Sequence, residues 1–105
     1  MVFTNLPDRE SALKLAALLI DQRLAACVNL LAPCNSIYRW RGEVQNDTEH
    51  PLLIKTSSDR YDALAEAICA QHPYELPEIV AIRIDRGLPE YLRWLESETR
   101  PDAPD

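Results

Sequence analysis

The chain has 105 residues, of which 47% are hydrophobic and 27% are charged. We expect one domain at residues 1–100, followed by a mobile tail at residues 101–105. Seventeen acidic residues against eleven basic ones give a net charge of -6, so nucleic acid is not expected as a partner. The two glycines are too few for a glycine-rich loop that cradles phosphates.

The cysteines bear on the cellular compartment. Cys27, Cys34 and Cys69 are odd in number and lack CxxC spacing, which argues against a zinc or disulfide framework. We therefore expect reduced thiols and a cytoplasmic protein. No apolar run approaches the roughly 20 residues that cross a bilayer, so no membrane partner is expected. The residues after Met1 lack the basic start of a signal peptide.

The first half of the chain opens with a brief strand at residues 1–5. Pro7 and Asp8 predict the start of a helix, because proline fits the first turn and a carboxylate there suits the helix dipole. The helix should end near residues 24–26. Its predicted apolar face consists of residues at helical spacing, namely Leu13, Ala16, Ala17, Ile20 and Leu24.

Strand signals dominate the middle of the chain. Residues 26–31 and 36–45 predict two strands, since both are rich in apolar, aromatic and β-branched residues. The best turn signal follows at Asn46–Asp47, and residues 51–57 predict the returning strand. Gly42 is interpreted as a bulge within the longer strand, with a turn at Gly42 as the alternative.

A second helix is expected after Ser58 or Asp59, either of which can cap it. Its buried stripe is predicted to comprise Tyr61, Leu64, Ala65, Ile68 and His72. Pro73 should end this helix, because the residue before a proline is pushed out of the helical region.

The last predicted elements are a strand and a short helix. Residues 78–84 alternate in polarity, which predicts a strand with Val80, Ile82 and Ile84 pointing inward. Gly87 and Pro89 then introduce the C-terminal helix.

The element order predicts an α+β fold of the ferredoxin-like split βαβ type (β-α-β-β-α-β), with an extended hairpin and a short C-terminal helix. The turn at residues 46–47 would leave residues 26–31 incompletely paired, and an unpaired edge favours pairing with another chain. We therefore hypothesise that the hairpin crosses subunits, with Tyr38 and Trp40 packing on a neighbour. A ligand-stacking platform is the alternative role for these two rings. Trp94 is expected at an open edge or subunit boundary.

Five segments carry a resemblance to a known family. They are "NLPDRESA", "RLAACVNLLAPCNSIYRWRGEV", "LLIKT", "HPYELPEIVAI" and "YLRWLE". With them the chain resembles the CutA family, the divalent-cation tolerance proteins. The resemblance implies a homotrimer built through the long hairpin and binding of copper and other divalent metal ions. It also implies an architecture similar to trimeric nitrogen-signalling proteins, which bind ligands in clefts between subunits.

The resemblance points to His72 as a metal ligand. Metal-binding members have a cysteine where this chain has Thr4, and two histidines where it has Gln71 and His72. Only His72 matches, so the predicted Cu(II) or other divalent cation is weakly bound, with Cys69 or Glu75 as a companion ligand. The alternative is a histidine packed at a helix C-terminus, where its partial positive charge suits the dipole.

A cleft lined by Lys55, Tyr74 and Glu78 is the basis of the second functional hypothesis. In that case the chain is a signalling-type trimer that binds a small anionic metabolite, and metal binding is incidental. Glu78 can also be purely structural, bonding to backbone amides or to a basic group such as Lys55. No nucleophile, base and orienting group occur together in the sequence, so we do not expect an enzyme.

Overall fold

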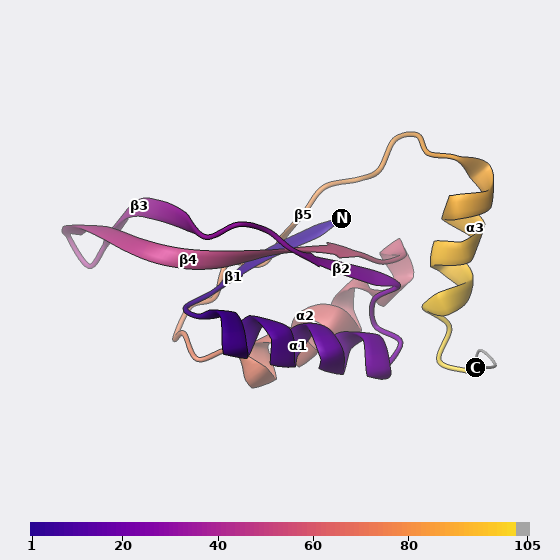
Figure 1. Cartoon of the computed structure of the whole chain (residues 1–105), viewed down its shortest axis with the longest axis horizontal. Helices are drawn as coiled ribbons and strands as arrows, with labels where there is room; N and C mark the ends of the chain where they lie inside the picture. The colour runs from indigo at the N-terminus through magenta and orange to yellow at the C-terminus, as the bar shows by residue number, and fades with distance from the viewer. Residues whose placement is uncertain (103–105) are drawn as a thin grey trace.

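The computed structural model describes residues 1–102 and has an α+β architecture with one antiparallel sheet (Figure 1). The elements in chain order are β1 (Val2–Leu6), α1 (Arg9–Asp21), β2 (Cys27–Leu30), β3 (Cys34–Trp40), β4 (Glu43–Lys55), η1 (Ser58–Arg60), α2 (Tyr61–Gln71), β5 (Val80–Ala81) and α3 (Pro89–Glu98). This order confirms the predicted ferredoxin-like fold with a C-terminal helix.

The strands are arranged in the order β2-β4-β1-β5, and β3 pairs with the distal part of β4. Residues 50–54 of β4 pair with β1 on one side, while residues 52–55 pair with β2 on the other. The predicted reason for incomplete pairing of residues 26–31 was therefore wrong, because β4 pairs with β2 as well as with β3; among the described residues β2 is still an edge strand with one side open. Strand β4 is long enough to serve β1, β2 and β3.

The long hairpin turns at Arg41–Gly42, not at Asn46–Asp47. Arg41 has φ 51° and Gly42 has φ 84°, and a type I′ turn needs positive φ at both central residues. Asn46 and Asp47 instead lie within β4, opposite residues 37 and 36 of β3. We call β3 and residues 43–49 of β4 the arm. It projects from the body along the molecule's 46 Å long axis (Figure 1).

Helix α1 starts where predicted, and Asp8 is its N-cap: the carboxylate accepts a hydrogen bond from Ser11 N at 2.7 Å, while Pro7 precedes the cap. Its buried face differs from the prediction: Leu13 and Ile20 are exposed. The side chains that α1 buries are Ala12, Leu15, Ala16 and Leu19. Both sets have helical spacing in this alanine- and leucine-rich segment, so periodicity alone did not distinguish them.

Helix α1 also ends earlier than residues 24–26. Arg23 adopts φ 55°, Arg23 N bonds to Ile20 O at 3.1 Å, and Leu24 N bonds to Leu19 O at 2.9 Å. This pair of bonds is a Schellman motif, which usually places glycine at the left-handed position. Because arginine occupies that position here, the stop signal is hard to recognise in the sequence.

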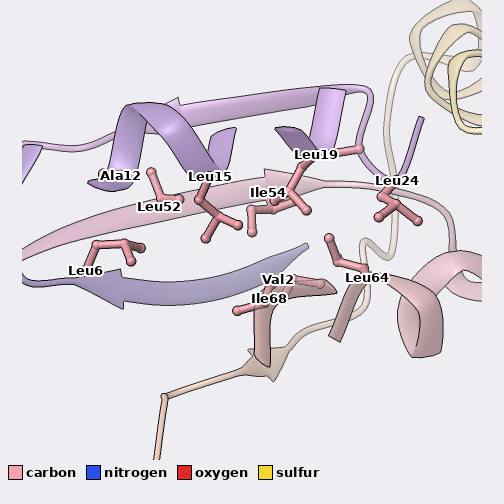
Figure 2. Close-up of a cluster of buried hydrophobic side chains, with 11 residues drawn as sticks. Val2, Leu6, Ala12, Leu15, Leu19, Leu24, Leu52, Ile54, Leu64 and Ile68 are labelled. Carbon is pink, nitrogen blue, oxygen red and sulfur yellow. The ribbon is translucent and has the colours of Figure 1, made fainter. Parts of the chain in front are cut away.

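The hydrophobic core lies between α1, α2 and one face of the sheet (Figure 2). Its largest fully buried side chains are Val2, Leu6, Leu19, Leu52, Ile54, Leu64 and Ile68. Neither α1 nor α2 covers the other face (Figure 1).

The strand predicted at residues 78–84 is much shorter in the structure. β5 pairs with Val2 and Phe3 only. Beyond it, Met1 and Ile82 exchange two hydrogen bonds of 2.8 Å through their backbone N–H and carbonyl groups. Val80 and Ile82 are half exposed, so their predicted inward orientation was wrong; Ile79 packs on the core instead. Val80 and Ile82 lie outside the buried cluster that α1 and α2 form with the sheet.

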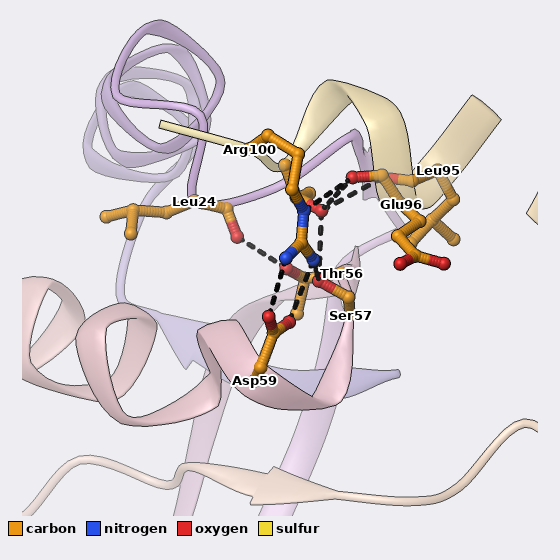
Figure 3. A network of polar contacts seen from close by, with 8 residues as sticks. Leu24, Thr56, Ser57, Asp59, Leu95, Glu96 and Arg100 are labelled. Carbon is orange, nitrogen blue, oxygen red and sulfur yellow. Dashed lines mark hydrogen bonds and ion pairs between the residues drawn. The ribbon is translucent and has the colours of Figure 1, made fainter. Parts of the chain in front are cut away.

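Helix α3 is docked by a polar network at its C-terminal end (Figure 3). Arg100 donates to the two carboxylate oxygens of Asp59 at 2.6 and 2.9 Å and to Ser57 Oγ at 2.8 Å. The Thr99 hydroxyl lies 3.0 Å from Ser57 Oγ. Pro101 and Asp102, in the predicted mobile tail, form an exposed turn, and residues 103–105 of that tail lie outside the described residues.

Candidate functional site

A cleft of about 840 Å³ lies where the arm meets the segment that follows α2. It is lined by Asn5 of β1, by residues 36–40 of β3, by Asp47 and Glu49 of β4, and by residues 73–78. We call it the arm-base cleft. It brings together segments separated by more than 70 residues in the sequence, and the long hairpin makes this possible.

His72 fixes the wall formed by residues 73–78. It is only 8% exposed, and its Nε2 lies 2.6 Å from the carbonyl oxygen of Asn5. Its Nδ1 accepts a hydrogen bond from Tyr74 N at 3.2 Å. A nitrogen that accepts is unprotonated, so the proton of a neutral ring sits on Nε2 and is donated to Asn5. Asn5 Nδ2 in turn donates to the Glu78 carboxylate at 3.3 Å.

Two phenols contact carboxylates of β4 in the cleft. Burial, and then a hydrogen bond to Glu49, raise the pKa of Tyr74 well above its usual value. The Tyr38 hydroxyl donates to Asp47, and this hydrogen bond raises the pKa of Tyr38. Both hydroxyls therefore remain protonated donors at neutral pH. Glu49 is only 7% exposed.

The cleft is lined by more acidic than basic side chains. Four carboxylates line it, from Asp47, Glu49, Glu75 and Glu78, whereas Arg39 is the one basic side chain in its lining among the described residues. An excess of carboxylates over basic groups gives a negative potential, which attracts cations and repels anions.

Arg41 lies at the rim of the cleft, at the tip of the arm. Its Nη2 is 2.7 Å from the Glu75 carboxylate, and its Cζ is 5.2 Å from the centroid of the Trp40 ring. The chain's own guanidinium group is thus held between an aromatic ring and a carboxylate, although the Arg41 and Glu75 side chains are 67% and 72% exposed.

Most of the residues singled out in the sequence meet at this cleft. Tyr38, Trp40, Tyr74, Glu75 and Glu78 all line it. Lys55 does not line it; it pairs with Cys27 at the opposite end of β4. Glu78 accepts from Asn5 rather than from Lys55. Trp94 lies on α3 and is exposed, with its ring centroid 5.4 Å from that of Tyr91 and the two rings tilted.

Asp47 and Glu49 were missed by the sequence analysis. The turn predicted at residues 46–47 placed them at a hairpin tip, whereas the true turn places them inside β4. Residues 43–49 alternate along a strand that faces β3, and this alternation would have grouped Asp47 and Glu49 on one face.

The residues present do not form a complete metal site. Both ring nitrogens of His72 are engaged in hydrogen bonds, so an ion at His72 would have to displace Tyr74 N or Asn5 O. Cys69 is exposed, while His72 is buried. Within residues 1–102 no three His, Cys, Asp or Glu side chains converge in a way that would hold an ion. The described residues also include no helix that is both long and apolar enough to cross a membrane.

Together the sheet order and the arm define an α+β protein of ferredoxin-like fold, with a cleft where the arm meets the segment after α2. Residues 1–98 match the family described as "CutA1 divalent ion tolerance protein", and the chain belongs to this family.

Curated relatives carry the same family name. The chain is 46% identical to the divalent-cation tolerance protein CutA of Thermus thermophilus, over 94% of this chain and 96% of the relative. It is 41% identical to the chloroplastic protein CutA of Arabidopsis thaliana, over 95% of this chain and 55% of the relative. The chain thus spans about half the length of that plant relative and of its rice counterpart.

Solved structures agree with the fold. The Thermus thermophilus Cut A1 structure superposes with a TM-score of 0.92 at 46% identity, covering 94% of this chain and 96% of that one. A structure described as a PII-like protein CutA from Nostoc, in apo form, superposes with a TM-score of 0.88 at 42% identity, covering 94% and 95%.

Proposed function

We propose that the chain acts in the response to divalent cations as a non-enzymatic, cytoplasmic homotrimer whose arm-base cleft binds cations weakly. The observation that carries this proposal is the lining of the cleft, four carboxylates against Arg39. Oxygen ligands of this kind suit hard and borderline ions held in exchange with solvent, rather than a tightly caged ion. Cu(II) is one ion that the cleft would take in this way.

The surface of one chain supports self-association. Monomeric proteins rarely expose many large apolar side chains in one region. Here nine of the twelve exposed large apolar side chains of residues 1–102 lie on the arm, on residues 76–88 and on α3: Ile37, Tyr38, Val44, Leu76, Val80, Ile82, Leu88, Tyr91 and Trp94. The sheet also leaves the outer edge of β2 unpaired within residues 1–102.

The number of subunits, three, rests on the family resemblance. In this arrangement Tyr38, Trp40 and Trp94 lie at subunit boundaries, and the cleft opens beside a neighbouring chain. Light scattering on the purified protein should give three times the chain mass. A clean monomer at micromolar concentration would contradict the assembly.

Cation binding at the cleft is tested by calorimetric titration with Cu(II). Glu49→Gln keeps an acceptor for the Tyr74 hydroxyl but removes a charge from the cleft, so it should weaken binding. Glu66→Gln, an exposed position on α2, removes the same charge elsewhere and should leave binding unchanged. Equal weakening in both variants would show that only net charge matters and would refute a role for the cleft.

A small anionic metabolite, the second hypothesis, fits the cleft of one chain less well. Glu75 and Glu78 would face such a ligand, and Lys55 is not there to compensate them. A thermal-shift screen with dicarboxylates and phosphate esters should therefore give no stabilisation.

A further inference from the structure

The segment that follows α2, residues 73–78, forms one side of the arm-base cleft and is held by few backbone contacts. We call this segment the wall. Pro73 has no backbone N–H to donate. Within residues 1–102, Tyr74 N is the one backbone N–H of the wall with a hydrogen-bond partner, and that partner is Nδ1 of His72 at 3.2 Å. The path of the chain as it leaves α2 therefore depends on the state of a single imidazole ring.

The His72 ring itself is fixed to the body of the protein. The backbone N–H of His72 donates to Ile68 O at 2.8 Å, which closes the last turn of α2. The ring donates from Nε2 to Asn5 O at 2.6 Å and is packed against the Tyr74 ring, with the two centroids 4.8 Å apart. With the residue only 8% exposed, the ring cannot turn over and exchange its two nitrogens without breaking the bond to β1.

A proton and the wall compete for the same lone pair of His72. Nδ1 accepts from Tyr74 only while it is unprotonated, because a histidine cation is a donor at both nitrogens. When a proton from solvent binds Nδ1, its N–H faces the N–H of Tyr74 and the hydrogen bond between them is lost. The bond from Nε2 to Asn5 O becomes charge-assisted, and such bonds are stronger. Protonation thus strengthens the side of the ring that faces β1 and breaks the side that holds the wall.

The surroundings of the ring favour movement of the wall once the charge is present. Among the described residues no carboxylate forms an ion pair with His72, and a buried charge without a partner is costly. A wall that moves away lets water reach the imidazolium. The titratable groups around the ring come from α2, the wall and β4, and they are Cys69, Tyr74, Glu78, which reaches Asn5 Nδ2, Glu49, which contacts the Tyr74 hydroxyl, and His50, opposite Leu6.

We propose that His72 is a pH-sensitive latch of the arm-base cleft. The neutral ring holds the wall through Tyr74 N, and protonation of the ring releases Tyr74 and loosens residues 73–78 while α2 stays bonded to β1. Histidine is the side chain whose charge ordinarily changes between about pH 8 and about pH 5. Because Tyr74 and Glu78 line the cleft, release of the wall changes the shape of the cleft. The latch is independent of whether a cation binds there.

The test is amide hydrogen exchange of Tyr74, followed by NMR in metal-free buffer at about pH 8 and about pH 5. Each rate is divided by the intrinsic rate of an unfolded peptide at the same pH. Wild type should lose about fivefold to tenfold of its Tyr74 protection at the lower pH, because one hydrogen bond is broken. The ¹⁵N shift of His72 Nδ1, recorded in the same titration, reports protonation of the ring, and the loss of protection should have the same midpoint.

His72→Gln separates the latch from other effects of acid. The glutamine amide can still donate to Asn5 O but takes up no proton in this range, so Tyr74 protection should be equal at both pH values, whatever its level. His50→Gln is the matched control, because His50 is the other of the two histidines in the chain. This variant should keep the pH dependence of wild type.

The remaining outcomes would overturn the latch. A His72 ring that stays neutral at about pH 5, or Tyr74 protection that does not change when the ring is protonated, would refute it. A pH dependence that persists in His72→Gln, or disappears in His50→Gln, would refute it too. An equal loss of protection at Ile68 would show that α2 unfolds and that the wall is not released separately. Since these measurements use no metal, failure of Cu(II) to bind would overturn the proposed function and leave the latch standing.

Discussion

The Nε2 nitrogen of His72 lies 2.6 Å from the carbonyl oxygen of Asn5, and this hydrogen bond ties the end of α2 to β1. Strand β5 pairs with only Val2 and Phe3 and does not reach Asn5. The carbonyl oxygen of Asn5 therefore takes its hydrogen bond on this side of β1 from the His72 ring. The histidine is therefore a structural anchor for the wall of the cleft. Its alternative reading as a helix-terminal packing residue fits this geometry better than the metal ligand does.

His72→Ala should destabilise the protein by about 2 to 3 kcal/mol, because it removes a buried ring and leaves the Asn5 carbonyl without a donor. Urea denaturation followed by circular dichroism measures this difference. Gln71→Ala, at the exposed neighbouring position, serves as the control and should change stability little. A His72→Ala variant as stable as Gln71→Ala would contradict the anchoring role.

Thr4→Val should stabilise the protein by about 1 kcal/mol. Thr4 is 1% exposed, and its Oγ1 has no hydrogen-bond partner among the described residues. A buried hydroxyl without a partner carries a desolvation cost, and valine has nearly the same shape without the polar atom. Urea denaturation again provides the measurement. A loss of stability would indicate that the hydroxyl finds a partner, such as an ordered water.

Asp59→Asn should lower stability near neutral pH but not in strong acid. Hydrogen bonds from Arg100 and Ser57 lower the pKa of Asp59 from 3.8 to about 2. A group whose folded pKa is depressed contributes stability above its unfolded pKa, and this contribution is lost as the pH falls from about 4 to about 2. Melting curves of wild type and Asp59→Asn should therefore converge toward pH 2. A difference that persists unchanged in acid would exclude the ion pair as its source.

Tyr74 should ionise only at a pH well above the usual range for tyrosine, because burial and the Glu49 contact raise its pKa. Absorbance at the phenolate band, recorded during alkaline titration, measures this. The absorbance of wild type should exceed that of Tyr74→Phe only at the high-pH end of the titration. The protein should also lose stability there, because the raised pKa of Tyr74 in the folded state favours its neutral form. A difference centred near pH 10 would show that Tyr74 is solvated.

Much of the fold could be predicted from local signals. The cap at Asp8, the stop at Pro73 and the buried Leu64 and Ile68 follow from chemistry that acts within a few residues. The hairpin turn was mispredicted because asparagine and aspartate are common turn residues, which favoured Asn46–Asp47. Arg41 adopts a positive φ in the actual turn, although arginine has no preference for that conformation.

The site was predictable only in part, for a related reason. Tyr74 and Glu78 were placed at a cleft wall by the family resemblance, and both do line the cleft. The positions of Asp47 and Glu49 depend on how the 13-residue β4 is paired with β3. A turn predicted at the wrong residues shifts this pairing along the whole hairpin. Lys55 was assigned to the cleft by resemblance, but the length of β4 carries it to the other end of the sheet.

The central claim is that cations bind at the cleft carboxylates and not at His72. Its most direct test is calorimetric titration of Cu(II) into wild type and His72→Gln, both folded, at the same pH, because the glutamine amide can still donate to the Asn5 carbonyl and hold the cleft wall. Wild type and His72→Gln should show the same weak, saturable binding. Loss of saturable binding in His72→Gln, with its fold intact, would contradict the claim.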